Sequence, residues 1–325
     1  MAYIWSIHKQ RRANTWLSGG TRGFFAAGHG GGGPIFSKNI DYITLATTGD
    51  GADFGDLTIV RSAMSSAAAD YTRIVFLGGS TQDAEPYKTN TIDSIVEATT
   101  GNATDFGDLT VARSGCGASC DSTRAIQWGG IGPLNVMDYI TMASTGDAAD
   151  FGDTLHQDIY HTAFASPTRA VKGSGSDTNN IEYATIATTG NGVDFGDLSH
   201  GHTGSGSGSN STRGVFGAGY GSGPQSADNG GSPHIEYVTI ASLGNATNFG
   251  DVDSGVRYIS ACHNNLRVVL GGGQIGAAPS KTPTLQMEYF AIATTGNSAD
   301  FGDLSVLKAN YSGGSCAHGG LNGGI

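Results

Sequence analysis

The chain has 325 residues, of which 53 are glycine, and a formal net charge of −11. This glycine content disfavours long helices, and the acidic balance, with no Lys/Arg cluster beyond Lys9, Arg11 and Arg12, argues against nucleic-acid binding. No apolar run is long enough for a membrane span and the N-terminus has no secretory-signal pattern, so we expect neither membrane insertion nor export by a signal peptide.

Six near-copies of an eleven-residue segment divide the chain, one of them TTGNATDFGDL at residues 99–109. An arginine that opens an apolar run and an acid that opens an alternating run precede each copy. The acid lies 13 residues before the phenylalanine of FGD in all six copies, whereas the arginine-to-acid interval varies from 13 to 23. Length variation is therefore confined to one loop per repeat. The arginines are Arg22, Arg73, Arg124, Arg169, Arg213 and Arg267, and the acids are Asp41, Asp93, Asp138, Glu182, Glu236 and Glu288.

Each repeat predicts four elements in chain order. The run that begins at the arginine, as in TRIVFLGG at 72–79, predicts a strand, and IDYITLA at 40–46 alternates with the period of a strand. TTGN or TTGD is typical of a turn, because Gly, Asn and Asp tolerate positive φ. ADFGDL predicts a short strand, and TVARSGCGAS at 110–119 predicts a fourth. The pattern indicates an all-β, six-bladed β-propeller with four antiparallel strands per blade, with a seven-bladed ring or a solenoid as alternatives.

The two ends of the chain carry copies of the same strand. Residues 304–318, with Lys308 in the basic position, are expected to close the ring beside TRGFFAAG of the first blade. Residues 1–16 then hold a redundant copy, because Arg11 precedes Arg22 by the same 11 residues that separate Arg113 from Arg124. We expect residues 1–16 to form an attachment arm and residues 17–325 the propeller, the alternative being a composite seventh blade. The arm's apolar anchors would be Tyr3, Ile4, Trp5 and Ile7.

The repeat resembles the kelch repeat. Kelch blades have a strand that begins near a basic residue, a strand that ends in Gly-Gly, a strand with an acid and then an aromatic, and a strand with a bulky aromatic. Arg61, Gly78–Gly79 and Asp41–Tyr42 fit the first three, and Phe replaces the usual Trp. TTGNATDFGDL, STRGVFGAG and the late AHGG also resemble kelch-like proteins of marine and cyanobacterial bacteriophages. That resemblance implies a kelch-repeat viral protein on the virion exterior, in multiple copies per particle, as a tail fibre, another appendage or a head decoration.

The acids of DFGD are candidates for calcium ligation or for a structural role. Sixfold recurrence favours structure, because a catalytic site is needed only once. We expect these Asp side chains to accept backbone hydrogen bonds and the six arginines to pair with them, for example Arg124 with Asp105 or Asp153. The six structural aspartates are Asp56, Asp108, Asp153, Asp197, Asp251 and Asp303.

Histidines and one acid interrupt the repeat in the strand expected to line a central channel. They are candidate metal ligands, but their spread over four blades favours a polar channel lining. No cofactor or metal is predicted, and the four cysteines, which lack zinc spacing, are expected to be buried thiols. The channel candidates are His156, Asp158, His161, His200, His202, His263 and His318.

The variable loops between the second and third strands are the predicted binding surface, because loops on a rigid scaffold carry binding. Their candidate residues are Phe36, Lys38, Tyr87, Lys88, Tyr220, Gln225, His234, Gln274 and Lys281. The sequence therefore predicts a non-enzymatic virion structural protein. Its arm would contact other virion proteins, and its loops would contact a host-surface glycan or protein. A glycan-processing enzyme on the same scaffold is the alternative, although the chain has no GxSxG, HExxH or Walker motif.

Overall fold

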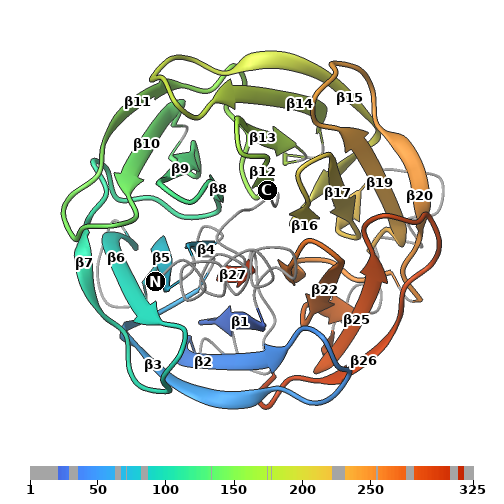
Figure 1. Ribbon diagram of the computed structural model, residues 1–325, viewed down its shortest axis with the longest axis horizontal. Coiled ribbons are helices and arrows are strands. Elements are labelled where there is room, and N and C mark those ends of the chain that lie inside the picture. Colours follow the sequence, from blue (N-terminus) through green and yellow to red (C-terminus); the bar gives the residue numbers. More distant parts are fainter. Residues whose placement is uncertain are drawn as a thin grey trace, which may run out of the picture.

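The computed structural model describes residues 21–28, 36–62, 67–70, 72–81, 87–132, 134–173, 175–176, 178–221, 231–253, 255–275 and 282–307, and the backbone of 314–317. Six four-stranded antiparallel units surround one axis as the blades of a six-bladed β-propeller (Figure 1). The predicted fold class is thus confirmed. Within these ranges there is no helix that could cross a membrane.

Each blade runs from a short inner strand at the axis to an outer strand at the rim. In the first three blades the strands are β1 (Arg22–Ala26), β2 (Ser37–Thr44) and β3 (Ala52–Arg61); β4 (Ala67–Ala69), β5 (Arg73–Ser80), β6 (Lys88–Val96) and β7 (Thr104–Asp108); and β8 (Gly117–Cys120), β9 (Arg124–Trp128), β10 (Val136–Thr141) and β11 (Ala149–Asp153).

The other three blades repeat this order with two additions. The fourth and fifth contain β12 (Thr162–Ala165), β13 (Arg169–Gly173), β14 (Thr178–Thr185) and β15 (Val193–Thr203), then β16 (Gly206–Ser209), β17 (Arg213–Gly217), β19 (His234–Thr239) and β20 (Thr247–Asp251). The sixth contains β21 (Ser260–His263), β22 (Arg267–Gly271), β25 (Gln286–Ala291) and β26 (Ala299–Asp303). β18 (Tyr220–Gly221) extends the fourth blade, and β23 (Gln274–Ile275) pairs with β24 (Thr282–Pro283).

The C-terminal strand β27 (Gly314–Ala317) closes the ring as the inner strand of the first blade. It pairs with β1 in the register Phe24↔Cys316, as predicted for the segment 304–318. The predicted arm, residues 1–16 with Tyr3, Ile4, Trp5 and Ile7, lies outside the described residues.

The phenylalanine of each FGD anchors the core between the layers of the blade. Phe54 is buried and meets Phe24 and Tyr42 edge-on, with ring centroids 5.1 and 5.9 Å away. Edge-to-face pairs of this kind add about 1 kcal/mol to the free energy gained by burying the ring. The 13-residue interval from acid to phenylalanine keeps this aromatic contact in register across the hairpin, for example between Tyr139 and Phe151 in the third blade.

The eleven-residue segment joins neighbouring blades. The turn of one blade pairs with the outer strand of the blade before it: Gly101 N–H donates to Phe54 O at 2.9 Å and Ala103 N–H to Asp56 O at 2.8 Å. In addition, Asp56 N–H donates to Asn102 Oδ1 at 3.1 Å. The prediction that the FGD aspartate side chains accept these bonds is wrong, because the acceptor is the Asn or Asp after TTG. The donor N–H groups are those of Asp56, Asp108, Asp153, Asp197, Asp251 and Asp303, and the acceptors are Asn102, Asp147, Asn191, Asn245, Asn297 and Asp50.

The six arginines do not form the predicted ion pairs with the FGD aspartates. The guanidinium of Arg124 lies 4.4 Å from the ring centroid of Tyr139, and its Nη1 donates to Ile186 O of the next blade at 2.7 Å. The strand register explains the difference: Arg124 lies opposite Thr141, so its side chain extends over Tyr139 two residues away. The arginines therefore pack on an aromatic ring of their own blade and connect it to the next blade through a turn carbonyl. The corresponding carbonyl acceptors of Arg22, Arg73, Arg169 and Arg213 are Glu97, Met142, Ile240 and Ile292.

Small residues fill the centre of the ring. The inner strands β8 (GASC) and β16 (GSGS) are buried throughout, and side chains bond across blades, as from Ser209 Oγ to Ala165 O at 2.7 Å. The predicted histidine-lined channel is wrong for most of its candidates. Only the last residues of segments such as TVARSGCGAS form the inner strand, and the rest connect the rim to the axis. His263 lies on β21; His156, Asp158, His161, His200 and His202 lie on connections or on β15; His318 lies outside the described residues.

Candidate functional site

The propeller has two faces with different construction. Two kinds of turn lie on the turn face: those that precede the six arginines, and those of the eleven-residue segments, such as TTGN. On the loop face lie the loops between second and third strands and the connections from outer to inner strands. All six loops of variable length therefore lie on one face, above the core.

A buried acid on each third strand joins its blade to the preceding blade just beneath the loop face. Asp93 accepts hydrogen bonds from Thr58 N–H at 3.2 Å and Thr58 Oγ1 at 2.5 Å. Its other bond comes from Arg61 Nη2 at 2.7 Å, and both charged side chains are fully buried. Burial lowers the pKa of Arg61 to about 10 although Asp93 opposes the change, so the guanidinium is charged at neutral pH. Asp138 repeats the arrangement with Thr110 and Arg113 in the third blade.

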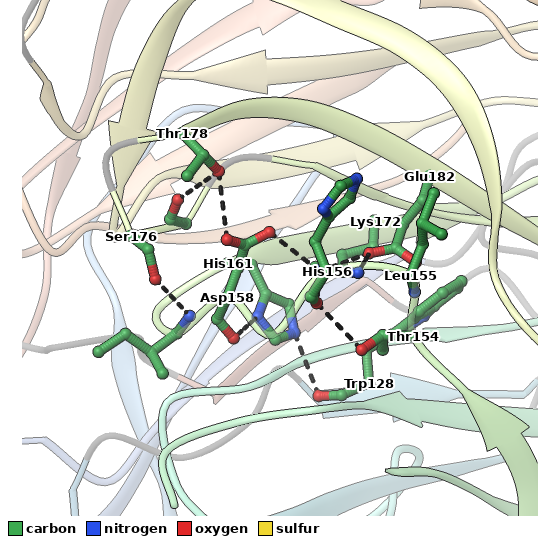
Figure 2. Close-up of polar contacts among 12 residues, drawn as sticks. Trp128, Thr154, Leu155, His156, Asp158, His161, Lys172, Ser176, Thr178 and Glu182 are labelled. Carbon is green, nitrogen blue, oxygen red and sulfur yellow. Dashed lines mark hydrogen bonds and ion pairs between the residues drawn. The ribbon is translucent and has the colours of Figure 1, made fainter. Parts of the chain in front are cut away.

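In the fourth blade the charges exchange places (Figure 2). Asp158 stands where the preceding repeats have Arg61 and Arg113, and the cation comes instead from Lys172 on β13. Lys172 Nζ lies 2.6 Å from Glu182 Oε1 and 3.2 Å from Asp158 Oδ2, with all three side chains buried. Sequence reasoning missed Lys172. The aligned repeats contain the signal. In this blade a lysine stands where the other repeats have an apolar or amide residue, and at a second position an acid stands where the preceding repeats have an arginine.

His161 borders this cluster and is buried against two carbonyl groups. Its Nδ1 lies 3.1 Å from Asp158 O and its Nε2 lies 3.1 Å from Trp128 O (Figure 2). Burial, with the nearby positive charge of Lys172, holds the pKa of His161 well below its usual value despite these two carbonyls. A neutral imidazole has one N–H, so it donates to one carbonyl at a time.

In the fifth blade the acid faces a histidine of the preceding blade in place of a lysine or arginine. His202 Nε2 lies 3.6 Å from Glu236 Oε2, with both side chains buried. Burial acts to raise the pKa of Glu236, but hydrogen bonds from His202 and Ser199 outweigh it and the pKa is lowered. Nearby, His200 stacks on His234 with ring centroids 5.5 Å apart, and His234 Nδ1 lies 3.0 Å from Asp251 Oδ1. This junction therefore holds three histidines on the loop face.

The acid's length varies with its cation. Aspartate accompanies the long side chains of Arg61 and Arg113, whereas the longer glutamate accompanies Lys172 and His202. The longer carboxylate side chain thus accompanies a partner whose side chain reaches less far than that of arginine. In the sixth blade Glu288 accepts from Asp253 N–H at 3.0 Å, and in the first Asp41 accepts from Ser305 Oγ at 2.6 Å. Lys308, which stands at the repeat position of Arg61 and Arg113, lies outside the described residues.

The predicted loop residues fall into three groups. Tyr220 and His234 come together at the junction of the fourth and fifth blades, because Tyr220 pairs with Thr203 on β15 and His200 of that strand stacks on His234. Five others are spread over the first, second and sixth blades, namely Phe36, Lys38, Tyr87, Lys88 and Gln274. Lys38 pairs with Asp56 at 3.1 Å, and Lys88 donates to Ile131 O at 2.8 Å. Gln225 and Lys281 lie outside the described residues.

The described residues contain no group of three or more His, Cys, Asp or Glu side chains that could hold a metal ion. The buried acids described above are instead bound by backbone N–H groups and by cations of the blade or its neighbour. Their arrangement can fix the blades and the positions of the loop ends.

Comparison with known proteins gives no matching family model and no matching curated protein.

Proposed function

We propose that this protein is a non-enzymatic structural protein of a bacteriophage virion and that its loop face is the contact surface. The observation that carries the proposal is the division of every blade into a fixed end and a variable end. The turn of the eleven-residue segment forms a junction with the same hydrogen bonds at all six boundaries, whereas the loops on the opposite face differ in length from blade to blade.

Rigid support beneath variable loops is the arrangement found in many binding proteins. The buried pairs Arg61–Asp93 and Arg113–Asp138 hold adjacent blades together directly under those loops. The virion assignment rests on the sequence resemblance to kelch-like phage proteins. The experiment for it is antibody labelling of purified particles viewed by electron microscopy. Label on intact particles supports the assignment, and label only on lysate debris contradicts it.

Attachment through residues 1–16 is part of the proposal. Strand β27 occupies the inner position beside β1, so the copy of that strand at Arg11 is left over for another role. Deletion of residues 2–14 is expected to leave the melting temperature unchanged and to abolish incorporation into particles. Loss of folding on deletion would contradict the arm.

Binding and catalysis are separated by incubating the purified protein with host surface polysaccharide. Saturable binding with no change in the polysaccharide's chain length supports the proposal. Shortening of the polysaccharide would instead establish the alternative, a glycan-processing enzyme.

A further inference from the structure

A pair of tyrosines stands at the axis on the loop face, at a position that other repeats give to glycine. The position lies two residues before each inner strand, and it holds Gly115 in the third blade and Gly204 in the fifth. The fourth and sixth blades place Tyr160 and Tyr258 there. All four residues have a left-handed backbone, with φ of 61° and 64° for the glycines and 55° for both tyrosines.

Backbone hydrogen bonds link these positions around the axis. Tyr160 N–H donates to Gly115 O at 2.7 Å, and Gly204 N–H donates to Tyr160 O at 2.8 Å. The two tyrosine rings meet edge-on across the fifth blade, with centroids 6.0 Å apart. Glycine makes room for them: a Cβ on Gly204 would lie 2.5 Å from the Tyr258 ring, and one on Gly115 would lie 3.1 Å from the Tyr160 ring. The rings therefore meet at the loop-face end of the packed centre.

The tyrosines hold this conformation at a cost. A left-handed backbone is strained for a residue with a Cβ, whereas glycine adopts it freely. Among the described residues, every non-glycine residue with positive φ lies at the loop-face end of its blade, and strain of this kind concentrates at binding sites. These residues are Ala27, Tyr87, Tyr160, Ser176, Ala218 and Tyr258. Since glycine serves at the same position in neighbouring blades, closing the fold does not require a tyrosine there.

We propose that Tyr160 and Tyr258 form the central stacking site of the loop face for a neutral glycan. Both tyrosines are half-buried, so each residue is held in place while part of it remains open to solvent. Tyrosine suits a sugar because it offers an apolar face to the C–H side of the ring and a hydroxyl to its polar edge. The chain's charge of −11 disfavours anionic sugars, which leaves neutral ones.

Polar groups beside the tyrosine pair suit sugar hydroxyls. Ser176, itself left-handed, accepts from Ile159 N–H at 2.9 Å next to Tyr160. The backbone of Gln274 pairs with that of Arg257 next to Tyr258, which places one of the predicted loop residues beside the axis. A protein partner fits less well. Large exposed apolar side chains of the described part lie in different blades, as with Val60 on β3 and Val111 and Leu155 on the connections after β7 and β11. A stable protein interface needs about 800 Å² per partner.

The inference rests on the proposed function, and glycine substitution tests it. Replacing Tyr160 and Tyr258 together by glycine restores the residue found at Gly115 and Gly204 and relieves the backbone strain. We expect the melting temperature to stay the same or rise while glycan affinity falls at least about tenfold. The Tyr160→Phe and Tyr258→Phe variants keep the ring and should retain most of the affinity. Ala27→Gly is the matched control for the relief of backbone strain, since Ala27 has φ of 60° but its side chain is buried after the end of β1.

The probes are an array of neutral and anionic oligosaccharides, then titration calorimetry with chitohexaose, maltohexaose and the neutral oligosaccharide with the strongest array signal. Binding to a neutral oligosaccharide that the double glycine variant loses, with unchanged stability, supports the site. Two outcomes overturn it: no neutral oligosaccharide binds, or the double variant loses stability and keeps its affinity. If the wild-type protein binds host cells and protease treatment of the cells abolishes that binding, the partner is a protein. The proposed function then stands without the glycan site.

Discussion

The backbone N–H of Asp56 donates to Oδ1 of Asn102, 46 residues further along the chain and in the next blade, at 3.1 Å. The equivalent bond closes all six junctions, including the one between Asp303 and Asp50 that joins the last blade to the first. The eleven-residue segment therefore fixes the position of each blade relative to the next. Its recurrence reflects the number of junctions in the ring rather than a repeated chemical site.

Substitution of Asn102 tests the contribution of this side chain. Asn102→Ala removes the acceptor of Asp56 N–H, and we expect it to lower the free energy of unfolding by about 1 kcal/mol. Asn102→Asp should be nearly neutral, because Asp147 and Asp50 fill the same position at two other junctions. Urea unfolding measures both. An alanine variant as stable as the wild type would show that the two backbone bonds of the junction suffice.

The glycine of FGD offers a prediction with a close internal control. Gly55 has φ of +151°, and a Cβ there would lie 2.4 Å from Gly101 O. Gly49 has φ of +156°, but its Cβ would meet nothing within 4 Å. Both alanine variants incur the same backbone strain, so their difference isolates the contact between blades. We expect Gly55→Ala to unfold at a clearly lower temperature than Gly49→Ala in a thermal melt. Equal melting temperatures would mean that the turn can move away from the strand without loss.

The exchanged charges of the fourth blade predict a compensating pair of substitutions. Lys172→Gln leaves Asp158 and Glu182 buried without their cation, which should cost about 3–5 kcal/mol. Asp158→Arg places a second cation beside Lys172 and should also destabilise. The double variant rebuilds the third blade's arrangement, in which Arg113 reaches Asp138 and Gln127 occupies the strand position of Lys172.

We expect the double variant to recover at least half of the loss seen in Lys172→Gln, measured as a double-mutant cycle in urea. Recovery will be incomplete because Glu182 is one methylene longer than Asp138. Additive losses would show that the two residues do not act as one pair.

The fold could be predicted because its information is repeated six times. The fixed acid-to-phenylalanine interval identifies the third and outer strands, and the copy at 304–318 identifies the closing strand. Contacts between blades could not be predicted in the same way. We expected Arg124 to pair with an aspartate. Its guanidinium instead packs on the ring of Tyr139 in its own blade and donates to the carbonyl of Ile186, 62 residues away in the next blade.

The binding surface, too, could be predicted only in part. Loop length showed which face varies, but it did not show which residues meet at the axis. Tyr160 and Tyr258 are 98 positions apart in the sequence, and the arrangement of successive blades around one axis brings them together. The sequence signal was their alignment with Gly115 and Gly204, which becomes visible once the inner strands have been located.

The buried His161 predicts how stability changes in mild acid. Its pKa in the folded protein is held well below the usual 6.5 by burial and by Lys172. As pH falls below about 6.5, the unfolded chain takes up a proton at this histidine and the folded protein does not. The free energy of unfolding therefore decreases toward acid, by up to about 1.4 kcal/mol per pH unit from this one group.

His161→Gln removes that group while keeping an N–H donor for Asp158 O or Trp128 O. The variant should be less stable than wild type at pH 7.5, and the difference should shrink as pH is lowered to 5. Urea unfolding at half-unit pH intervals measures it. His200→Gln is the control, since His200 is only partly buried, and it should leave the acid dependence of stability closer to that of the wild type. A His161→Gln curve parallel to wild type would mean that the folded protein accepts the proton at this site, through imidazolium bonds to both carbonyls.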